Sequence, residues 1–317
     1  MGAMLGRTAN GLFWMSRYLE RAENTARLLE AAFRMALTRD LQTAEAEWRS
    51  LVETLGLRAI YELHNDSYIG HEVWNFILRG RENPNSVARM MDAVRSNARS
   101  TRTAITTELW TAINTSWMEI SAQLKRPVSQ GQVGEVVETI RRAGMLAHGA
   151  MEGTLLRFEG YHFARVGTFV ERADNVARIL DMKYYLLLPS LRYVGSTMDT
   201  GQWEQVLLSV SGDRAYHWLN AGRIEARGIV EFLVLDRRFP RSLAYCHGEL
   251  DEELACLAAI HGAETGCHEL MHEASKIFDC LTIDDIFEVG LHEFLTSFID
   301  RNAGIAKAVA DDYRFLA

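Results

Sequence analysis

The dominant pattern along the chain is helical. In long windows, apolar residues recur at positions i, i+3, i+4 and i+7, and only four prolines interrupt the 317 residues. This spacing gathers apolar side chains on one face of an α-helix, and the alternation typical of strands is nearly absent. The pattern predicts an all-α protein with helices over residues 9–37, 44–56, 67–79, 85–104, 106–124, 132–158, 161–188, 201–210, 213–235, 241–260, 262–280 and 283–313.

A charged ten-residue motif occurs twice. ERAENTARLL begins at Glu20, and ERADNVARIL begins 151 residues later at Glu171, with seven of the ten positions identical. Further on, FILRGRENPNSV (76–87) matches FLVLDRRFPRSL (232–243), and we expect Ser86 and Ser242 to cap the helices that follow. We therefore predict one domain over 1–317, a helical bundle of two pseudo-repeated halves, 1–158 and 159–317.

The motif separates into two faces when it is placed on a helix at ~100° per residue. Apolar positions of the first copy form a core face made of Leu12, Met15, Tyr18, Leu19, Ala22, Ala26, Leu29 and Phe33. The polar positions opposite it are Arg17, Glu20, Asn24 and Arg27, with Arg21 at the rim. In the second copy the polar positions are Glu171, Asn175 and Arg178, with Arg172 at the rim and Thr168 in place of the first arginine.

The polar stripe has three interpretations at this point. It is an exposed face with weak i,i+4 ion pairs, or a buried ionic network in which the two copies pair across a pseudo-twofold axis. In the third, the stripe lines a cleft between the halves, where arginines bind a carboxylate or phosphate and a glutamate acts as a base or binds an amine.

Two other patterns contain residues of the types that bind anions or metal ions. Arg95, Arg99 and Arg102 share one helical face, so acidic groups of another helix or an anionic ligand should face them. CHELMHEA contains the HExxH pattern of zinc hydrolases at His268, Glu269 and His272, as a weak alternative function. Because no sheet accompanies this helix, we expect ordinary helix residues there and assign no metal site.

Composition narrows the function classes. The net charge of -8 argues against a general nucleic-acid or anionic-membrane surface, and no apolar run approaches the ~20 residues that span a bilayer. We recognise no secretory signal and expect a cytoplasmic protein. Four cysteines in the last quarter have no CxxC spacing, and no glycine-rich phosphate loop is present, so we expect no cofactor.

The segments NGLFWMSRYLERAENTARLL, NPNSVARMMDAVRSNARSTRTAITTELWTAIN, GTFVERADNVARILDMKYYLL and FLVLDRRFPRSLAYC together resemble the alpha-E family, a bacterial all-helical family. The resemblance covers nearly the whole chain. It implies that the protein is encoded beside a circularly permuted ATP-grasp protein and a transglutaminase-like protein. That setting implies ATP-dependent formation or modification of peptide or amide bonds on a peptide or small amine, with a non-catalytic scaffold that docks the ATP-grasp partner as the alternative.

The family motif maps onto Arg17, Glu20, Arg21 and Arg27, then Asn97 and Arg99, then Glu171, Arg172, Asp174 and Arg178. Two positions depart from the usual family pattern: Thr168 stands where an arginine is usual, and Ser96 where a glutamate is usual. We expect Glu20 and Glu171 as catalytic residues, and an anionic or amine-bearing substrate bound by Arg17, Arg21, Asn24, Arg27, Arg99, Arg172, Asn175 and Arg178.

Overall fold

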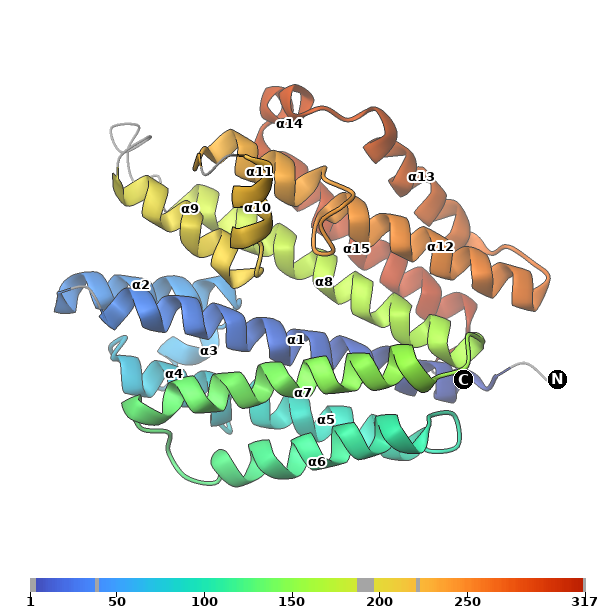
Figure 1. Cartoon of the computed structure of the whole chain (residues 1–317), viewed down its shortest axis with the longest axis horizontal. Coiled ribbons are helices and arrows are strands. Elements are labelled where there is room, and N and C mark those ends of the chain that lie inside the picture. The colour runs from blue at the N-terminus through green and yellow to red at the C-terminus, as the bar shows by residue number, and fades with distance from the viewer. Residues whose placement is uncertain (1–3, 38–39, 187–196, 221–222, 316–317) are drawn as a thin grey trace. The chain divides into compact units, whose positions relative to one another are not determined.

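The computed structural model describes residues 4–37, 40–186, 197–220 and 223–315 (Figure 1). Within these ranges the regular structure consists of α-helices and one short 3-10 turn, with no strand. The predicted all-α fold class is therefore confirmed. By compactness the chain divides into a first unit, Tyr18–Leu155, and a second unit, Met1–Arg17 together with Leu156–Ala317.

The first unit contains most of the long N-terminal helix and the helices up to α7. They are α1 (Gly6–Leu37, from Tyr18 on), α2 (Leu41–Thr54), α3 (Arg58–Glu62), α4 (Gly70–Arg79), α5 (Val87–Ser100), α6 (Thr107–Gln123), the 3-10 turn η1 (Gln130–Gln132) and α7 (Val133–Thr154). Helix α6 packs against both α5 and α7 (Figure 1). Helix α7 contributes a buried apolar face whose members recur at helical spacing, including Val133, Val136, Val137, Ile140, Ala143, Ala147 and Met151.

The second unit contains the start of α1 and the remaining helices. They are α8 (Glu159–Leu186), α9 (Thr197–Ser209), α10 (Asp213–Leu219), α11 (Ala226–Val234), α12 (Leu243–His261), α13 (Gly266–Cys280), α14 (Ile283–Val289) and α15 (Leu291–Asp312). Helix α8 packs against both α12 and α15 (Figure 1). The apolar face predicted for the second motif copy is buried there: Phe163, Val166, Phe169, Val170, Ala173, Ala177 and Leu180.

The start of α1 approaches α8 closely at Gly167. A Cβ atom on Gly167 would lie 2.3 Å from the carbonyl oxygen of Phe13, so only glycine fits at this contact. The helices that carry the two motif copies therefore touch within the second unit.

Two predicted helices are divided in the structure, and one helix was not predicted. The stretch 213–235 forms two helices, because the Asn220 side chain donates to the Tyr216 carbonyl where α10 ends. The stretch 283–313 divides at Gly290, whose φ of 103° no helix can continue through. The short helix α3 lies in a stretch predicted as a loop, and its five residues are too few to give a periodic signal.

The two predicted cap serines behave differently. Ser242 precedes α12, and its hydroxyl accepts a hydrogen bond from the Tyr245 amide at 3.0 Å, which satisfies one free amide of the first turn. Ser86 occupies the same position before α5, but its buried hydroxyl has no partner among the residues that the structure describes. In both matching segments, 76–87 and 232–243, a helix is followed by a turn and then by a second helix. The internal duplication itself stays a prediction.

Candidate functional site

The polar stripe of the first motif copy is buried. Glu20 has no exposed surface and Asn24 is 5 % exposed, and Glu23, which lies beside the stripe on the same helix, is 3 % exposed. On the opposite side of the same helix Leu12, Ala26 and Leu29 are also buried. The interpretation of this stripe as an exposed face therefore does not hold, because an ordinary solvated face would not withdraw two carboxylates from water.

Two carboxylates and one imidazole meet inside the first unit. Glu20 and Glu23 are one helical turn apart on α1, and His148 comes from α7. The Nε2 atom of His148 lies 3.4 Å from Oε2 of Glu20 and 3.9 Å from Oε2 of Glu23. One ligand atom from each of the three residues falls within 4.8 Å of the others. We call this group the Glu20 cluster.

Each carboxylate of the cluster is held from its own helix. The side-chain amide of Asn24 lies 3.4 Å from Oε1 of Glu20, and the guanidinium of Arg27 forms an ion pair with Oε1 of Glu23. Both donors sit four residues after the glutamate that they contact, which is the spacing at which helical side chains meet. The Oε2 atoms of both glutamates are the ones near His148.

Helix α7 leaves room for this arrangement at Gly144. A Cβ atom on Gly144 would lie 2.2 Å from Oε2 of Glu23, so the carboxylate occupies the space that any side chain would need. Gly144 and His148 are four residues apart and share one face of α7. Glu23, Gly144 and His148 carried no signal for this site in the sequence, because α1 and α7 meet only in the fold.

The second motif copy is organised around an ion pair. Nε of Arg17 donates to Oε2 of Glu171 at 2.9 Å, and Glu171 is 2 % exposed. The Arg17 guanidinium also lies 4.7 Å from the ring centroid of Trp14. This is one ion pair of the kind that the network interpretation predicts, since it joins the two copies. Thr168, which stands in place of the first arginine, donates its hydroxyl to its own helix at the Ala164 carbonyl.

The other predicted arginines of the motif have neighbours of their own. Arg21 lies over the Tyr18 ring, and Arg172 donates to the Pro240 carbonyl at 3.3 Å. Arg178 makes two hydrogen bonds to Asp174, and Asn175 donates to the backbone carbonyl of Glu171. The motif arginines Arg17, Arg27 and Arg178 are therefore each paired with a carboxylate of the protein.

Neutral groups face the arginine row on α5. Arg95 donates to the side-chain oxygen of Asn114 at 2.8 Å and lies 4.1 Å from the Trp117 ring, and Arg102 donates to the Ile105 carbonyl. Arg99 is exposed and forms no ion pair with a residue that the structure describes. The expectation of acidic groups facing this row was wrong; aromatic faces and oxygen dipoles accept the cations instead.

The HExxH pattern does not assemble as a zinc site. His268 is buried, and its Nδ1 atom accepts a hydrogen bond from the Thr265 amide at 2.8 Å, while Nε2 lies 3.1 Å from the Leu254 carbonyl. Glu269 and His272 are exposed. Beside them, burial raises the pKa of the Cys267 thiol to about 12, so this thiol is not a ready nucleophile. The zinc hydrolase alternative gains no support here.

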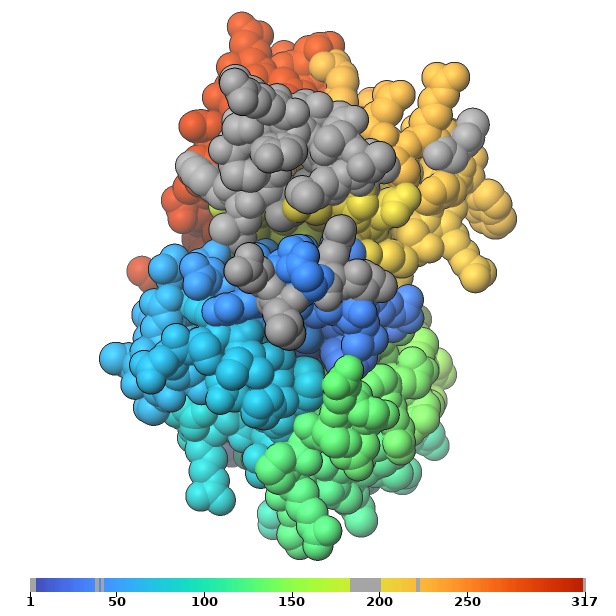
Figure 2. Space-filling model, turned by 90° about the vertical axis from the view of Figure 1, so that its left-hand side faces the viewer, coloured from blue at the N-terminus to red at the C-terminus, as the bar shows by residue number. Residues whose placement is uncertain are grey.

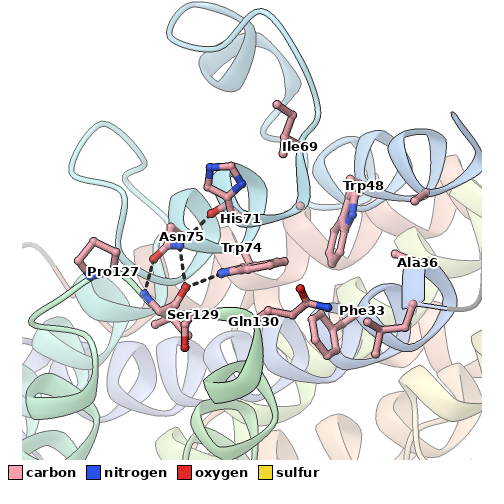
Figure 3. Close-up of a pocket in the computed structure, with 14 residues that line it drawn as sticks. Phe33, Ala36, Trp48, Ile69, His71, Trp74, Asn75, Pro127, Ser129 and Gln130 are labelled. Atoms are coloured by element: carbon pink, nitrogen blue, oxygen red, sulfur yellow. Dashed lines mark hydrogen bonds between the residues drawn. The ribbon is translucent and has the colours of Figure 1, made fainter. Parts of the chain in front are cut away.

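A pocket of about 530 Å³ opens elsewhere in the first unit. In Figure 2 the blue to cyan atoms of α2–α4 share a face with green atoms near the start of α7. Figure 3 shows the rings of Phe33, Trp48 and Trp74 on the walls, with Trp74 donating to the Val128 carbonyl at 2.8 Å. Asn75 is bonded twice to the backbone of Val128. These bonds fix the rim, and the walls suit an apolar or ring-shaped group.

Comparisons with known proteins find relatives that are themselves described as uncharacterized. The chain is 23% identical over 275 residues to the uncharacterized protein Mb2597 of Mycobacterium bovis and 22% identical to the uncharacterized protein Rv2567 of Mycobacterium tuberculosis. In each case 81% of this chain is covered, and the match spans only 30% of the relative's length. No solved structure matches. Among the described residues, every helix is too short or too polar to cross a membrane.

The family comparison agrees with the helical fold and with the repeated motif. The model of a family described as "a predicted alpha-helical domain with a conserved ER motif" matches residues 4–314. A Glu-Arg pair begins each motif copy here, at Glu20 and at Glu171. The match covers nearly the whole chain, and the chain therefore belongs to the Alpha-E family.

Proposed function

We propose that this chain is the helical, substrate-binding component of an ATP-dependent system that forms or modifies peptide or amide bonds. The observation that carries the proposal is the Glu20 cluster, in which a carboxylate with no exposed surface lies 3.4 Å from the ring nitrogen of His148. Buried ionisable groups cost stability, and proteins tend to retain them where they bind or react with a ligand.

The cluster suits a substrate that carries an amine. Two carboxylate oxygens would attract an ammonium group, and an imidazole beside them could take up a proton from it. The His148 side chain is 22% exposed, so solvent reaches part of its ring. In this proposal Glu20 is the group that contacts substrate, whereas Glu171 acts by positioning Arg17. An anionic substrate remains the alternative, bound by exposed arginines such as Arg99.

The ATP-dependent step belongs to a partner in this proposal. The sequence contains no glycine-rich phosphate loop, and the resemblance to the family implies a circularly permuted ATP-grasp protein as the enzyme that activates a carboxylate. A transglutaminase-like protein would cleave or exchange the resulting bond. The role of this chain is then to present the amine to the activated carboxylate, which is catalysis by positioning.

The test is ADP release by the chain co-purified with the ATP-grasp protein encoded beside it, in the presence of a mixture of amino acids and short peptides. Glu20→Gln should co-purify with the partner and lose at least tenfold in substrate-dependent ADP release. Glu30→Gln is the matched control, because Glu30 lies on the same helix and pairs with Arg141 away from His148. Unchanged ADP release in Glu20→Gln would refute a substrate role for the cluster.

The Arg17–Glu171 ion pair favours a second candidate, a non-catalytic scaffold that docks the ATP-grasp partner. For a scaffold, the charges matter only as a pair. Exchanging them, with Arg17→Glu and Glu171→Arg in one chain, should then restore partner binding that either single change weakens. A scaffold would also leave ADP release insensitive to Glu20→Gln.

A further inference from the structure

We propose that Glu20, Glu23 and His148 form a binding site for a first-row divalent transition-metal ion. The inference goes beyond the proposed function, because it concerns the chain alone and needs neither a partner nor a substrate. With the ion in place, a substrate amine would bind to the ion instead of to the carboxylates. It rests on the geometry of three side chains, on one ring nitrogen and on the contacts that orient the carboxylates.

The three ligand atoms have the spacing of one coordination sphere. With bonds of about 2.1 Å, neighbouring ligand atoms lie ~3.4 Å apart around a tetrahedral ion and ~3.0 Å apart around an octahedral one. The observed separations from His148 Nε2 are 3.4 Å to Glu20 and 3.9 Å to Glu23. Small side-chain rotations would bring all three atoms onto one ion.

The His148 ring provides an independent observation. Its Nε2 atom is shielded from water and has no hydrogen-bond partner among the described residues. Buried ring nitrogens normally have a partner, and a nitrogen without one that points at two carboxylate oxygens requires an explanation. A metal ion supplies the partner, because neutral imidazole donates its lone pair to the ion.

The contacts behind the cluster orient it as the outer shell of a metal site does. Asn24 lies against Oε1 of Glu20, and Arg27 is bonded to Oε1 of Glu23, so the Oε2 atoms of both carboxylates are the ones that approach His148. In metal sites, hydrogen bonds to the non-ligating oxygen fix a carboxylate and reduce the entropy lost on binding. Gly144 completes the arrangement, since a side chain there would push Glu23 out of place.

The donor set restricts the ion. Mg²⁺ and Ca²⁺ prefer oxygen ligands throughout, whereas one imidazole with two carboxylates suits Zn²⁺, Mn²⁺ or Fe²⁺. Three protein ligands leave at least one coordination position for water or another ligand. Of the three side chains, that of His148 is the most exposed, at 22%.

Equilibrium dialysis of the full chain tests the site. Protein stripped with a chelator is dialysed against Zn²⁺ and, separately, Mn²⁺, and bound metal is measured by elemental analysis. Wild type should bind one ion per chain at this site. Glu20→Gln and His148→Gln should each bind that ion at least tenfold more weakly. The controls Glu30→Gln and His64→Gln, which remove a carboxylate and an exposed imidazole elsewhere in the first unit, should match wild type.

Folding is checked in the same samples, because Glu20 is buried and its variant could lose structure. Circular dichroism should be the same for all the proteins, and His148→Gln, at a partly exposed position, carries the test if Glu20→Gln unfolds. Equal stoichiometry and affinity in wild type and His148→Gln would overturn the proposal. That result would leave the ADP-release assay untouched, so the failure of the metal site and the failure of the proposed function are distinguishable.

Discussion

Arg17 of the first motif copy and Glu171 of the second form a direct ion pair, with 2.9 Å between Nε and Oε2. The carboxylate is 2% exposed and the arginine side chain 15% exposed, so water screens the pair only weakly. The repeated motif therefore contributes a contact between the two helices that carry it, which neither copy could make alone.

Glu171→Gln should destabilise the protein by about 3 kcal/mol, because it leaves the Arg17 guanidinium without its counter-charge in a largely buried place. Denaturant unfolding measures the loss. Asp174→Asn on the same helix is the matched control: its partner Arg178 is 51% exposed, and we expect a change of at most ~1 kcal/mol. Equal losses in the two variants would contradict a special role for the Arg17 pair.

Gly167→Ala should destabilise by about 2 kcal/mol or more, since the added methyl group would meet the Phe13 carbonyl oxygen and push α1 away from α8. Thermal unfolding of the variant is the measurement. Gly248→Ala in α12 has open space around the new methyl group and should raise stability by up to ~1 kcal/mol. A Gly167→Ala protein as stable as wild type would show that the close approach is not required.

Gly290→Ala should cost about 1–3 kcal/mol, because φ is 103° there and an added Cβ atom would meet the Glu293 carboxylate. The comparison is Gly262→Asn, at a φ of 71° with open space around it. Asparagine tolerates this left-handed conformation, so we expect a loss below ~1 kcal/mol. Calorimetric melting of both variants measures the losses. Gly290→Ala should lose more stability than Gly262→Asn, and the reverse order would contradict the argument from backbone strain.

Stability should fall in acid partly through His247. Burial among Phe278 and Phe298 lowers the pKa of this imidazole to about 3. Between that value and ~6.5, the unfolded chain binds a proton that the folded chain does not, so stability rises with pH and is lost as the pH falls below ~6.5. From pH 7 to pH 5 this group alone should account for about 2 kcal/mol.

His247→Met removes that contribution, and its unfolding free energy should change less between pH 7 and pH 5 than that of wild type. Denaturant unfolding at the two pH values measures the difference. An unchanged pH slope in His247→Met would mean that other groups, not this imidazole, carry the acid sensitivity.

Local patterns predicted much of the fold. The apolar face of α1, with Leu12, Met15, Ala26 and Leu29, is buried as its spacing predicts, and Ser242 caps α12. Helical spacing could not predict that the polar stripe on the other side of α1 is buried as well. That depends on what covers the helix, and within the first unit α7 brings Gly144 against Glu23.

The site was predicted only in part for the same reason. Glu20 and Asn24 stood out because the motif is repeated, whereas His148 belongs to no motif and meets them only through the packing of α1 and α7. Glu23 precedes Arg27 by four residues, so helical spacing alone indicates no more than an ordinary i,i+4 ion pair between them. Both are side chains whose meaning comes from a tertiary neighbour, which helical periodicity does not encode.

The central claim is that the Glu20 carboxylate is kept for binding rather than for stability. The most direct measurement is the free energy of unfolding of Glu20→Gln beside Glu171→Gln in metal-free buffer. The amide keeps the volume of Glu20 and can still accept from Asn24, so we predict a change within ~1 kcal/mol for Glu20→Gln and a loss of about 3 kcal/mol for Glu171→Gln. A loss of several kcal/mol in both variants would contradict the claim and make the Glu20 cluster part of one structural ionic network.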